Sequence, residues 1–262
     1  AGLQPISTPC PHILPPRALR QILANQQNFL FQAKPLLDYL FQQVQYSHSM
    51  VILADQHGVV LETRGEQQFS SKAKQVALCA GACWNEQQRG TNAIGTALID
   101  QASIQIHGAE HFLDHHLFLT CAAAPIMDAQ GSLLGVLDIS GDAHHPHPHT
   151  LALVNLAATL LENRLLRAQT KHYACLQLHP QANGLDSPSE GLLLLDHDGY
   201  LRGANRIALG WLKRAWNDLG HIRLQDCLTT NGQTLLAHCT QTLHTADATS
   251  FFVRLNPAIK PS

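Results

Sequence analysis

Apolar runs that end in an aspartate and resume after a glycine recur three times along the chain. The three four-residue turns are residues 55–58, 128–131 and 196–199. Aspartate at the first turn position accepts hydrogen bonds from the turn amides, and glycine at the fourth tolerates the left-handed backbone that lets the second strand pair. The pattern predicts a β-hairpin at each turn. We expect the first two hairpins in one sheet and the third in a second domain.

Apolar residues spaced three and four positions apart predict two long helices. The first covers residues 19–44, and Pro35 is expected to kink or break it because proline lacks an amide proton. The second covers residues 150–167 and carries an apolar seam: Leu151, Val154, Ala158, Leu161 and Leu165. Two interpretations of the seam stay open. Either it packs on the back of a sheet, or it forms a dimer helix that also carries a signal into the next domain.

Residues 81–142, between these helices, combine small, polar and apolar positions in a way that suits a sensor pocket. Residues 90–98 predict a short helix capped by Thr91 or Asn92, with small residues facing a sheet. The strands predicted after it cover 103–107, 117–120 and the hairpin at 124–140. Small residues bring a helix close to a sheet and leave room for a ligand between them.

Periodicity is lost after the second helix, which predicts a domain boundary near residues 170–188. The predicted organisation is an N-terminal extension at 1–19, a first domain at 20–170, a linker at 171–188 and a second domain at 189–262. In the second domain Asn205 is expected to cap a helix. Later strands are expected at 221–224 and 249–255, with a helix over 234–244 between them.

Composition limits the function classes. The formal net charge is −2, from 17 Lys+Arg against 19 Asp+Glu, so the chain lacks the basic surface of a nucleic-acid-binding module. The apolar runs are too short to cross a bilayer, and prolines interrupt the N-terminus where a signal peptide needs a continuous apolar core. We therefore expect a cytoplasmic protein with no membrane segment.

Cysteine and histidine are the residues that raise the question of a metal. The seven cysteines, Cys10 among them, contain no C-x-x-C pair, which favours free thiols packed as small apolar groups. Cys79 with Cys83 leaves a redox or metal pair open, and the histidine-rich residues 144–149 leave a metal tract open. Two prolines interrupt that tract, and no acidic or thiol ligand lies within it. We expect no metal and no cofactor.

Four ordered motifs carry a family resemblance. They are WNEQQRGTNAIGTAL (84–98), GAEHF (108–112), LTCAAAPIMDAQGSLLGVLDISGD (119–142) and HPHTLALV (147–154). Together they resemble the GAF domain of bacterial sigma-54-dependent transcription activators of the acetoin catabolism regulator and dihydroxyacetone kinase operon regulator type. Residues 190–212 resemble the opening of a PAS domain. The resemblance implies an α+β fold, in which a GAF domain with an antiparallel sheet flanked by helices precedes a PAS-like α+β domain.

The resemblance implies a sensory region and not an enzyme. Thr96 stands where the lysine of a phosphate-binding loop would follow Gly95, and the sequence has neither a G-x-S-x-G elbow nor paired catalytic carboxylate motifs. The ATPase and DNA-binding parts of such activators would lie outside these residues, so DNA is expected as a partner only through them. A homodimer is expected.

The expected effector is a small oxygenated metabolite, such as acetoin or a diol. The candidate lining residues are Trp84, Thr91, Asn92, Thr96, His107, His111 and Cys121. An aromatic wall with convergent hydroxyl, amide and imidazole groups suits such a ligand; for each residue, capping or core packing is the alternative. Glu86 and Arg89 are expected to pair at the surface. The alternative function is a protein-interaction module that binds a metabolic enzyme subunit, such as a dihydroxyacetone kinase component.

Overall fold

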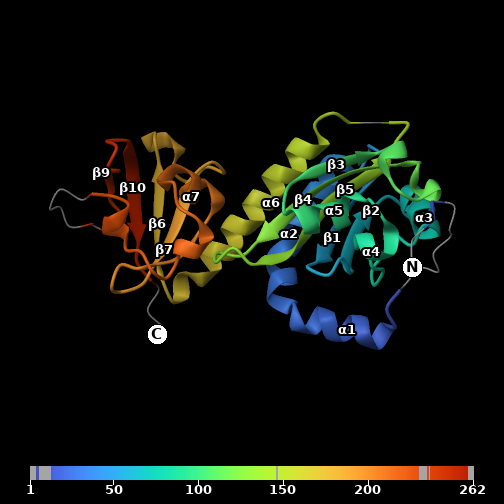
Figure 1. Cartoon of the computed structure of the whole chain (residues 1–262), viewed down its shortest axis with the longest axis horizontal. Coiled ribbons are helices and arrows are strands. Elements are labelled where there is room, and N and C mark those ends of the chain that lie inside the picture. The colour runs from blue at the N-terminus through green and yellow to red at the C-terminus, as the bar shows by residue number, and fades with distance from the viewer. Residues whose placement is uncertain (1–3, 6–12, 146, 230–234, 236, 259–262) are drawn as a thin grey trace. The chain divides into compact units, whose positions relative to one another are not determined.

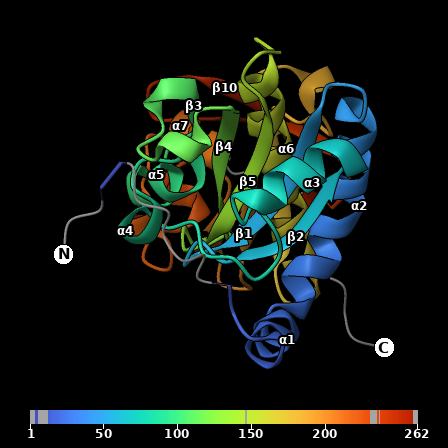
Figure 2. The same cartoon turned by 90° about the vertical axis from the view of Figure 1, so that its right-hand side faces the viewer.

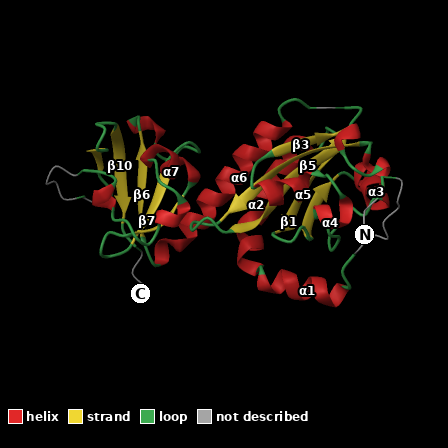
Figure 3. Cartoon of the chain, in the orientation of Figure 1, coloured by secondary structure: helices red, strands yellow, loops and turns green. Residues whose placement is uncertain are grey.

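The chain folds into two compact units, each built around an antiparallel sheet (Figures 1 and 3). The computed structural model describes residues 4–5, 13–145, 147–229, 235 and 237–258. One unit consists of residues 1–126 and 133–161, and the other of residues 127–132 and 162–262. The α+β class expected from the sequence is confirmed for both units.

The first sheet has the strand order β2-β1-β5-β4-β3. Its strands are β1 (Ser49–Asp55), β2 (Val60–Gly65), β3 (Ile104–His107), β4 (Leu119–Met127) and β5 (Leu133–Asp142). The helices of this part of the chain are α1 (Pro16–Asn25), α2 (Gln27–Val44), α3 (Gln67–Gln75), α4 (Glu86–Arg89), α5 (Ala93–Asp100) and α6 (Thr150–Arg167). Residues 119–127 form one continuous strand, where the sequence predicted a break after residue 120.

Side-chain alternation along the strands divides the sheet into two faces. Met50 and Ile52 of β1 pack in one core with residues of α3 and α5, so these helices cover one face. Helix α2 contacts β1 and β2 (Figure 2), and its buried residues, such as Leu37, lie outside that core. We conclude that α2 covers the opposite face, toward which Val51, Leu53 and Asp55 point.

The first two hairpins form as predicted, for the predicted reason. Asp55 Oδ1 accepts hydrogen bonds from the backbone amides of His57 and Val59, both at 2.9 Å. Gly58 completes the turn with a φ of 82°. Asp128 and Gly131 repeat the arrangement in the turn between β4 and β5, where Gly131 has a φ of 86°.

The helix predicted over residues 19–44 is divided at Gln26, a break that the sequence did not predict. Gln26 leaves the helical conformation, with φ −106° and ψ 20°, while its amide still donates to Ile22 O at 3.1 Å. Pro35 lies inside α2 without ending it. Helix α1 has no buried residue, and it lies apart from the sheet (Figures 1 and 2).

Helix α6 covers the predicted residues 150–167, and the burial of its seam favours one of the two interpretations. Within a single chain the exposed fraction is 0% for Val154 and Leu161, 4% for Ala158 and 8% for Leu165, while Leu151 is half-buried. These side chains already pack inside their own chain. The seam therefore does not provide a free apolar surface for a second helix.

The second sheet has the strand order β8-β7-β6-β10-β9. Its elements are β6 (Ala174–His179), β7 (Gly191–Leu195), β8 (Leu201–Ala204), α7 (Arg206–Leu212), β9 (Thr240–His244) and β10 (Ser250–Asn256). The third predicted hairpin is β7–β8, and Asn205 caps α7 by accepting from Ala208 N at 2.9 Å.

Two sequence predictions for this unit are wrong. The linker predicted at 171–188 contains β6, the central strand of the sheet. Both faces of β6 are buried, with Leu176 in one core and Cys175 in another, so its sequence lacks polar alternation. Residues 240–244, predicted as helical, form β9, which pairs with β10. Residues 234 and 236 of that predicted helix lie outside the described part of the chain.

Candidate functional site

The segment that joins α4 to α5 is held by asparagine caps and a tight glycine. Asn92, 1% exposed, accepts from Gly95 N at 2.9 Å and is therefore the cap of α5, whereas Thr91 is exposed. Gly90 has a φ of 63°, and a Cβ there would lie 2.4 Å from the ring of Phe112. This close approach packs the helices against the loop that contains the short 3₁₀ turns Gly108–Glu110 and Asp114–His116.

Trp84 lies at the centre of this region. Its side chain is 2% exposed, and Nε1 donates to Ala77 O at 3.0 Å. The indole stacks on His116, with ring centroids 4.7 Å apart, and the guanidinium carbon of Arg89 lies 5.1 Å from the indole. Trp84 is packed in the core, as the core-packing alternative expected, and its role as a ligand wall stays a prediction.

The predicted surface pair between Glu86 and Arg89 is wrong. Arg89 is 2% exposed, and no ion pair between it and Glu86 is found among the described residues. Its Nε donates to Cys83 O at 3.3 Å, while Nη2 is buried with no hydrogen-bond partner in the described part of the chain. Burial lowers the pKa of Arg89. Glu86 instead accepts a hydrogen bond from the hydroxyl of Thr96.

Two buried histidines complete the group. His111 Nδ1 lies 3.1 Å from Gly108 O, and a carbonyl oxygen only accepts, so Nδ1 carries the proton. Burial lowers the pKa of His111, so the ring is neutral near pH 7 and Nε2 presents a lone pair. This Nε2 is buried and, within the described residues, has no donor.

His116 is fully buried, and its ring centroid lies 6.1 Å from that of His111. Neither of its ring nitrogens has a partner in the part of the chain that the structure describes. Burial, with smaller contributions from His115, His111 and Arg89, lowers the pKa of His116 to about 3. We call Trp84, Arg89, His111 and His116 the histidine cluster.

A second polar group lies on the sheet, on the face that α3 and α5 cover. Ser140 Oγ donates to Asp138 Oδ2 at 2.5 Å and lies 3.1 Å from Cys121 Sγ. Asp138 pairs with Ile52 in the sheet register, which fixes the face toward which it points. Its Oδ1 is fully buried and accepts from no described residue. We call Cys121, Asp138 and Ser140 the strand triad.

Burial determines the protonation of the strand triad. It raises the pKa of Asp138 to about 7, although the hydrogen bond from Ser140 works in the opposite direction. Burial, together with the nearby Asp138 carboxylate, also raises the pKa of the Cys121 thiol. Cys121 is thus a neutral thiol at neutral pH and not an activated nucleophile.

The structure brings only some of the predicted lining residues together. Trp84 and His111 each lie against His116 in the histidine cluster, whereas Cys121 belongs to the strand triad. Thr96 bonds to Glu86, and the side chains of Thr91 and His107 are exposed. Sequence reasoning missed the residues that complete both groups: Arg89, His116, Asp138 and Ser140. Only the buried environment distinguishes them, and no short motif reports burial.

Metal and membrane features are not found in the described residues. No group of three or more His, Cys, Asp or Glu side chains among them is placed to hold a metal ion. The six cysteines that the structure describes are free thiols. Cys10 lies outside the described residues, as does Pro146, which belongs to the histidine-rich tract. Within the same described ranges, no helix has the length and apolar character needed to span a membrane.

Comparison with known proteins identifies the first unit. The family model described as "GAF domain" matches residues 32–165. The chain belongs to the GAF domain family. The family resemblance inferred from the sequence motifs is therefore confirmed.

Similar curated proteins are transcriptional regulators. The chain is 40% identical over 156 residues to the acetoin dehydrogenase operon transcriptional activator AcoR of Bacillus subtilis, covering 57% of this chain and 26% of that protein. It is 34% identical over 212 residues to the acetoin catabolism regulatory protein of Cupriavidus necator, covering 79% of this chain and 32% of that protein. The GAF chain thus spans about a third or less of the length of these relatives.

A solved structure shares the fold over nearly the whole chain. A chain of the E. coli DhaR(N)–DhaL complex superposes with a TM-score of 0.61 and 16% sequence identity, covering 97% of this chain and 95% of that chain. At this identity the likeness establishes the fold alone.

Proposed function

We propose that this GAF chain is the signal-sensing region of a bacterial transcription activator, and that the histidine cluster binds a small oxygenated metabolite. The observation that carries the proposal is the set of buried, unpaired polar atoms on Arg89, His111 and His116. Each such atom costs about 1–3 kcal/mol, and native structures contain few of them. A ligand that pairs with them would recover this free energy.

The chemistry of the unpaired atoms indicates what the ligand carries. Arg89 Nη2 can only donate, so it suits a carbonyl or hydroxyl oxygen. His111 Nε2 presents a lone pair, so it can accept a hydrogen bond from a hydroxyl group. Adjacent carbonyl and hydroxyl groups satisfy both, as in an acetoin-like hydroxyketone, and a diol satisfies them through two hydroxyls. The Trp84 ring supplies the apolar wall, and a neutral ligand avoids a further buried charge.

Helix α6 is the proposed route of the signal. Residues 150–161 belong to the first compact unit and residues 162–167 to the second. In the second unit, Asn163 Oδ1 accepts from Asn205 Nδ2 at 2.8 Å, and Glu162 pairs with Arg206 at 2.9 Å. We assign this unit as PAS-like, because its five-stranded antiparallel sheet carries a capped helix after the second hairpin strand. An ATPase of the sigma-54-dependent type would read the state of α6.

A thermal-shift assay on the intact chain tests the ligand proposal. Acetoin, 2,3-butanediol, glycerol and dihydroxyacetone are each titrated, and a ligand at a hundredfold excess over Kd stabilises the folded state by about 2.7 kcal/mol. Arg89→Met and His111→Phe should each raise Kd about tenfold or more, because each removes one buried hydrogen bond. His107→Ala, an exposed histidine on the same loop, is the matched control. Stabilisation that survives both cluster substitutions places the ligand elsewhere.

A second candidate function is binding of a metabolic kinase subunit. The structure with the same fold is a complex of DhaR(N) with DhaL. This chain also exposes large aromatic side chains on and after α2, with Phe31 70%, Tyr39 56% and Tyr46 86% exposed. A DhaL-type protein that binds the chain, while none of the small molecules does, would support this function in place of metabolite sensing.

Neither candidate function involves turnover. We expect the pure chain to hydrolyse no ATP and to convert neither acetoin nor dihydroxyacetone. Steady-state turnover that is lost with Arg89→Met would contradict the sensory assignment. We also propose a homodimer, whose interface does not include the buried seam of α6. Sedimentation at tens of micromolar protein, roughly the affinity range of a weak dimer, tests this.

A further inference from the structure

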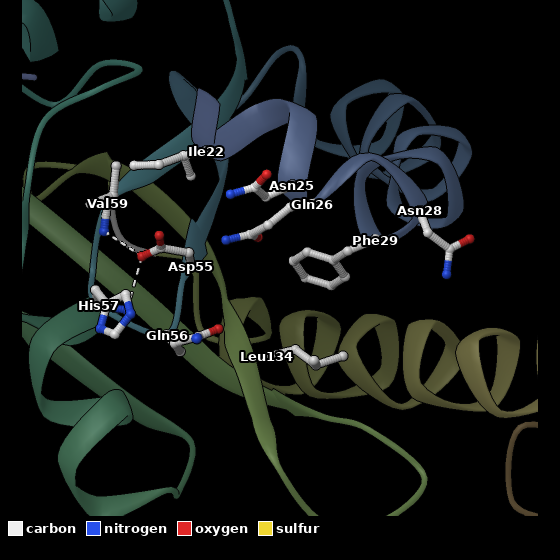
Figure 4. Close-up of a pocket in the computed structure, with 10 residues that line it drawn as sticks. All are labelled: Ile22, Asn25, Gln26, Asn28, Phe29, Asp55, Gln56, His57, Val59 and Leu134. Atoms are coloured by element: carbon white, nitrogen blue, oxygen red, sulfur yellow. Dashed lines mark hydrogen bonds between the residues drawn. The ribbon is translucent and has the colours of Figure 1, made fainter. Parts of the chain in front are cut away.

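A pocket of about 460 Å³ opens on the α2 side of the first sheet, away from the histidine cluster. It lies where α1 meets α2 and faces the β1–β2 turn (Figure 4). Ile22, Phe29, Val59 and Leu134 form its apolar part. The volume lies within the range of about 300–1,000 Å³ that is typical of small-molecule sites.

Asp55 places a buried carboxylate at this pocket. Its side chain is only 1% exposed. Oδ1 accepts both turn amides at 2.9 Å, and no described residue donates to Oδ2. Figure 4 shows this second oxygen on the side of Ile22 and Asn25, away from the dashed bonds. This oxygen has acceptor capacity that neither turn amide uses, and a molecule in the pocket is placed to donate to it.

Four carboxamides, Asn25, Gln26, Asn28 and Gln56, supply most of the remaining polar lining, and the exposed His57 completes it. Each carboxamide presents both a donor and an acceptor, whereas Asp55 presents only an acceptor. The lining residues of this pocket include neither lysine nor arginine. The lining therefore favours groups that both donate and accept, and it offers no permanently positive side chain to an anion.

From this geometry we infer that the pocket is a second ligand site of the GAF unit, and that it binds a neutral polyhydroxylated molecule. A hydroxyl donates to Asp55 Oδ2 and exchanges hydrogen bonds with the carboxamides. An ammonium group would pair with Asp55 but has no acceptor for the carboxamide N–H groups, and a carboxylate would face Asp55. The C–H faces of a polyol pack against Phe29 and Leu134.

Isothermal titration calorimetry of the intact chain tests this site with glycerol, sorbitol and D-glucose, and with choline and citrate as the cationic and anionic probes. Saturable heat is expected with at least one polyol and with neither charged probe. Asp55→Asn keeps an Oδ1 for the turn amides but replaces Oδ2 with a donor, so it should raise the polyol Kd about tenfold. Asn25→Ala, at the exposed end of α1, should raise Kd about threefold without touching the turn.

Two controls separate this site from the histidine cluster and from misfolding. Gln43→Ala changes an exposed carboxamide of α2 that lies outside the pocket lining, and it should leave the polyol Kd unchanged. His111→Phe should also leave it unchanged, because the cluster lies on the other face of the sheet. Saturation by choline or citrate alone, saturation by none of the probes, or a polyol Kd unaltered in both Asp55→Asn and Asn25→Ala overturns the inference.

Discussion

Replacing Asp138 by asparagine should change how the stability of the first unit depends on pH. Burial raises the pKa of Asp138 from 3.8 to about 7, so between these values the folded state holds a proton that the unfolded state has released. Stability therefore falls as pH rises through this interval and is constant above it. Asparagine has nearly the same shape and does not titrate.

The magnitude follows from proton linkage. Each pH unit between about 4 and about 7 removes about 1.4 kcal/mol from the free energy of unfolding, so the total loss is about 4 kcal/mol. Relative to wild type, Asp138→Asn should become progressively more stable across this range and then keep a constant difference. Ser140→Ala removes the donor to Asp138 Oδ2, so it should raise the carboxyl pKa further and move the upper end of the range to higher pH.

The pH dependence of wild-type stability alone does not reveal the contribution of Asp138, because His116 changes the stability in the opposite direction. Burial lowers the pKa of His116 from 6.5 to about 3, so stability falls as pH drops through that interval. From about pH 4 to 6.5 the two slopes nearly cancel. The difference between variant and wild type isolates Asp138.

Urea unfolding between pH 4.5 and 8.5, followed by tryptophan fluorescence, is the appropriate assay. Trp211→Phe and Trp216→Phe in every variant leave Trp84 as the reporter, since the chain has three tryptophans. A difference in unfolding free energy between Asp138→Asn and wild type that stays constant within about 1 kcal/mol refutes the reasoning. It would mean that Asp138 is ionised throughout this range and that its Oδ1 has a donor.

Three further predictions test other parts of the structure. Leu161→Asp should destabilise the fold by several kcal/mol, about 3–5, because it places a charge at a fully buried position, whereas Leu156→Asp should leave the melting temperature nearly unchanged. Asn92→Ala should cost about 1 kcal/mol in urea unfolding through loss of the α5 cap, and the exposed Thr91→Ala should stay within about 0.5 kcal/mol. His116→Phe should retain stacking on the neighbouring indole and, relative to wild type, become progressively more stable as the pH falls from 6.5 to about 3, which acid unfolding curves of both proteins would reveal.

The sequence by itself determined the features that depend on a few adjacent residues. The three Asp-x-x-Gly hairpins formed because the carboxylate and the glycine act within one turn. Residues 150–167 formed a helix because the apolar spacing is local. Asn92 and Asn205 cap their helices because a cap acts within three residues. The GAF motifs belong with these features, since they identified the family without coordinates.

Only the tertiary structure determined which residues are buried and which residues lie close together. The sequence predicted a linker where β6 lies, because both faces of β6 are covered by distant residues and its apolar and polar residues therefore do not alternate. The apolar spacing of the α6 seam is the same whether the seam packs on its own sheet or against a partner chain. Only the burial of the seam within one chain distinguishes these two interpretations. Arg89, His116 and Asp138 have no sequence signal, because an arginine, a histidine and an aspartate are ordinarily exposed. Long-range packing removes water from their polar atoms, and that desolvation marks them as candidate ligand contacts.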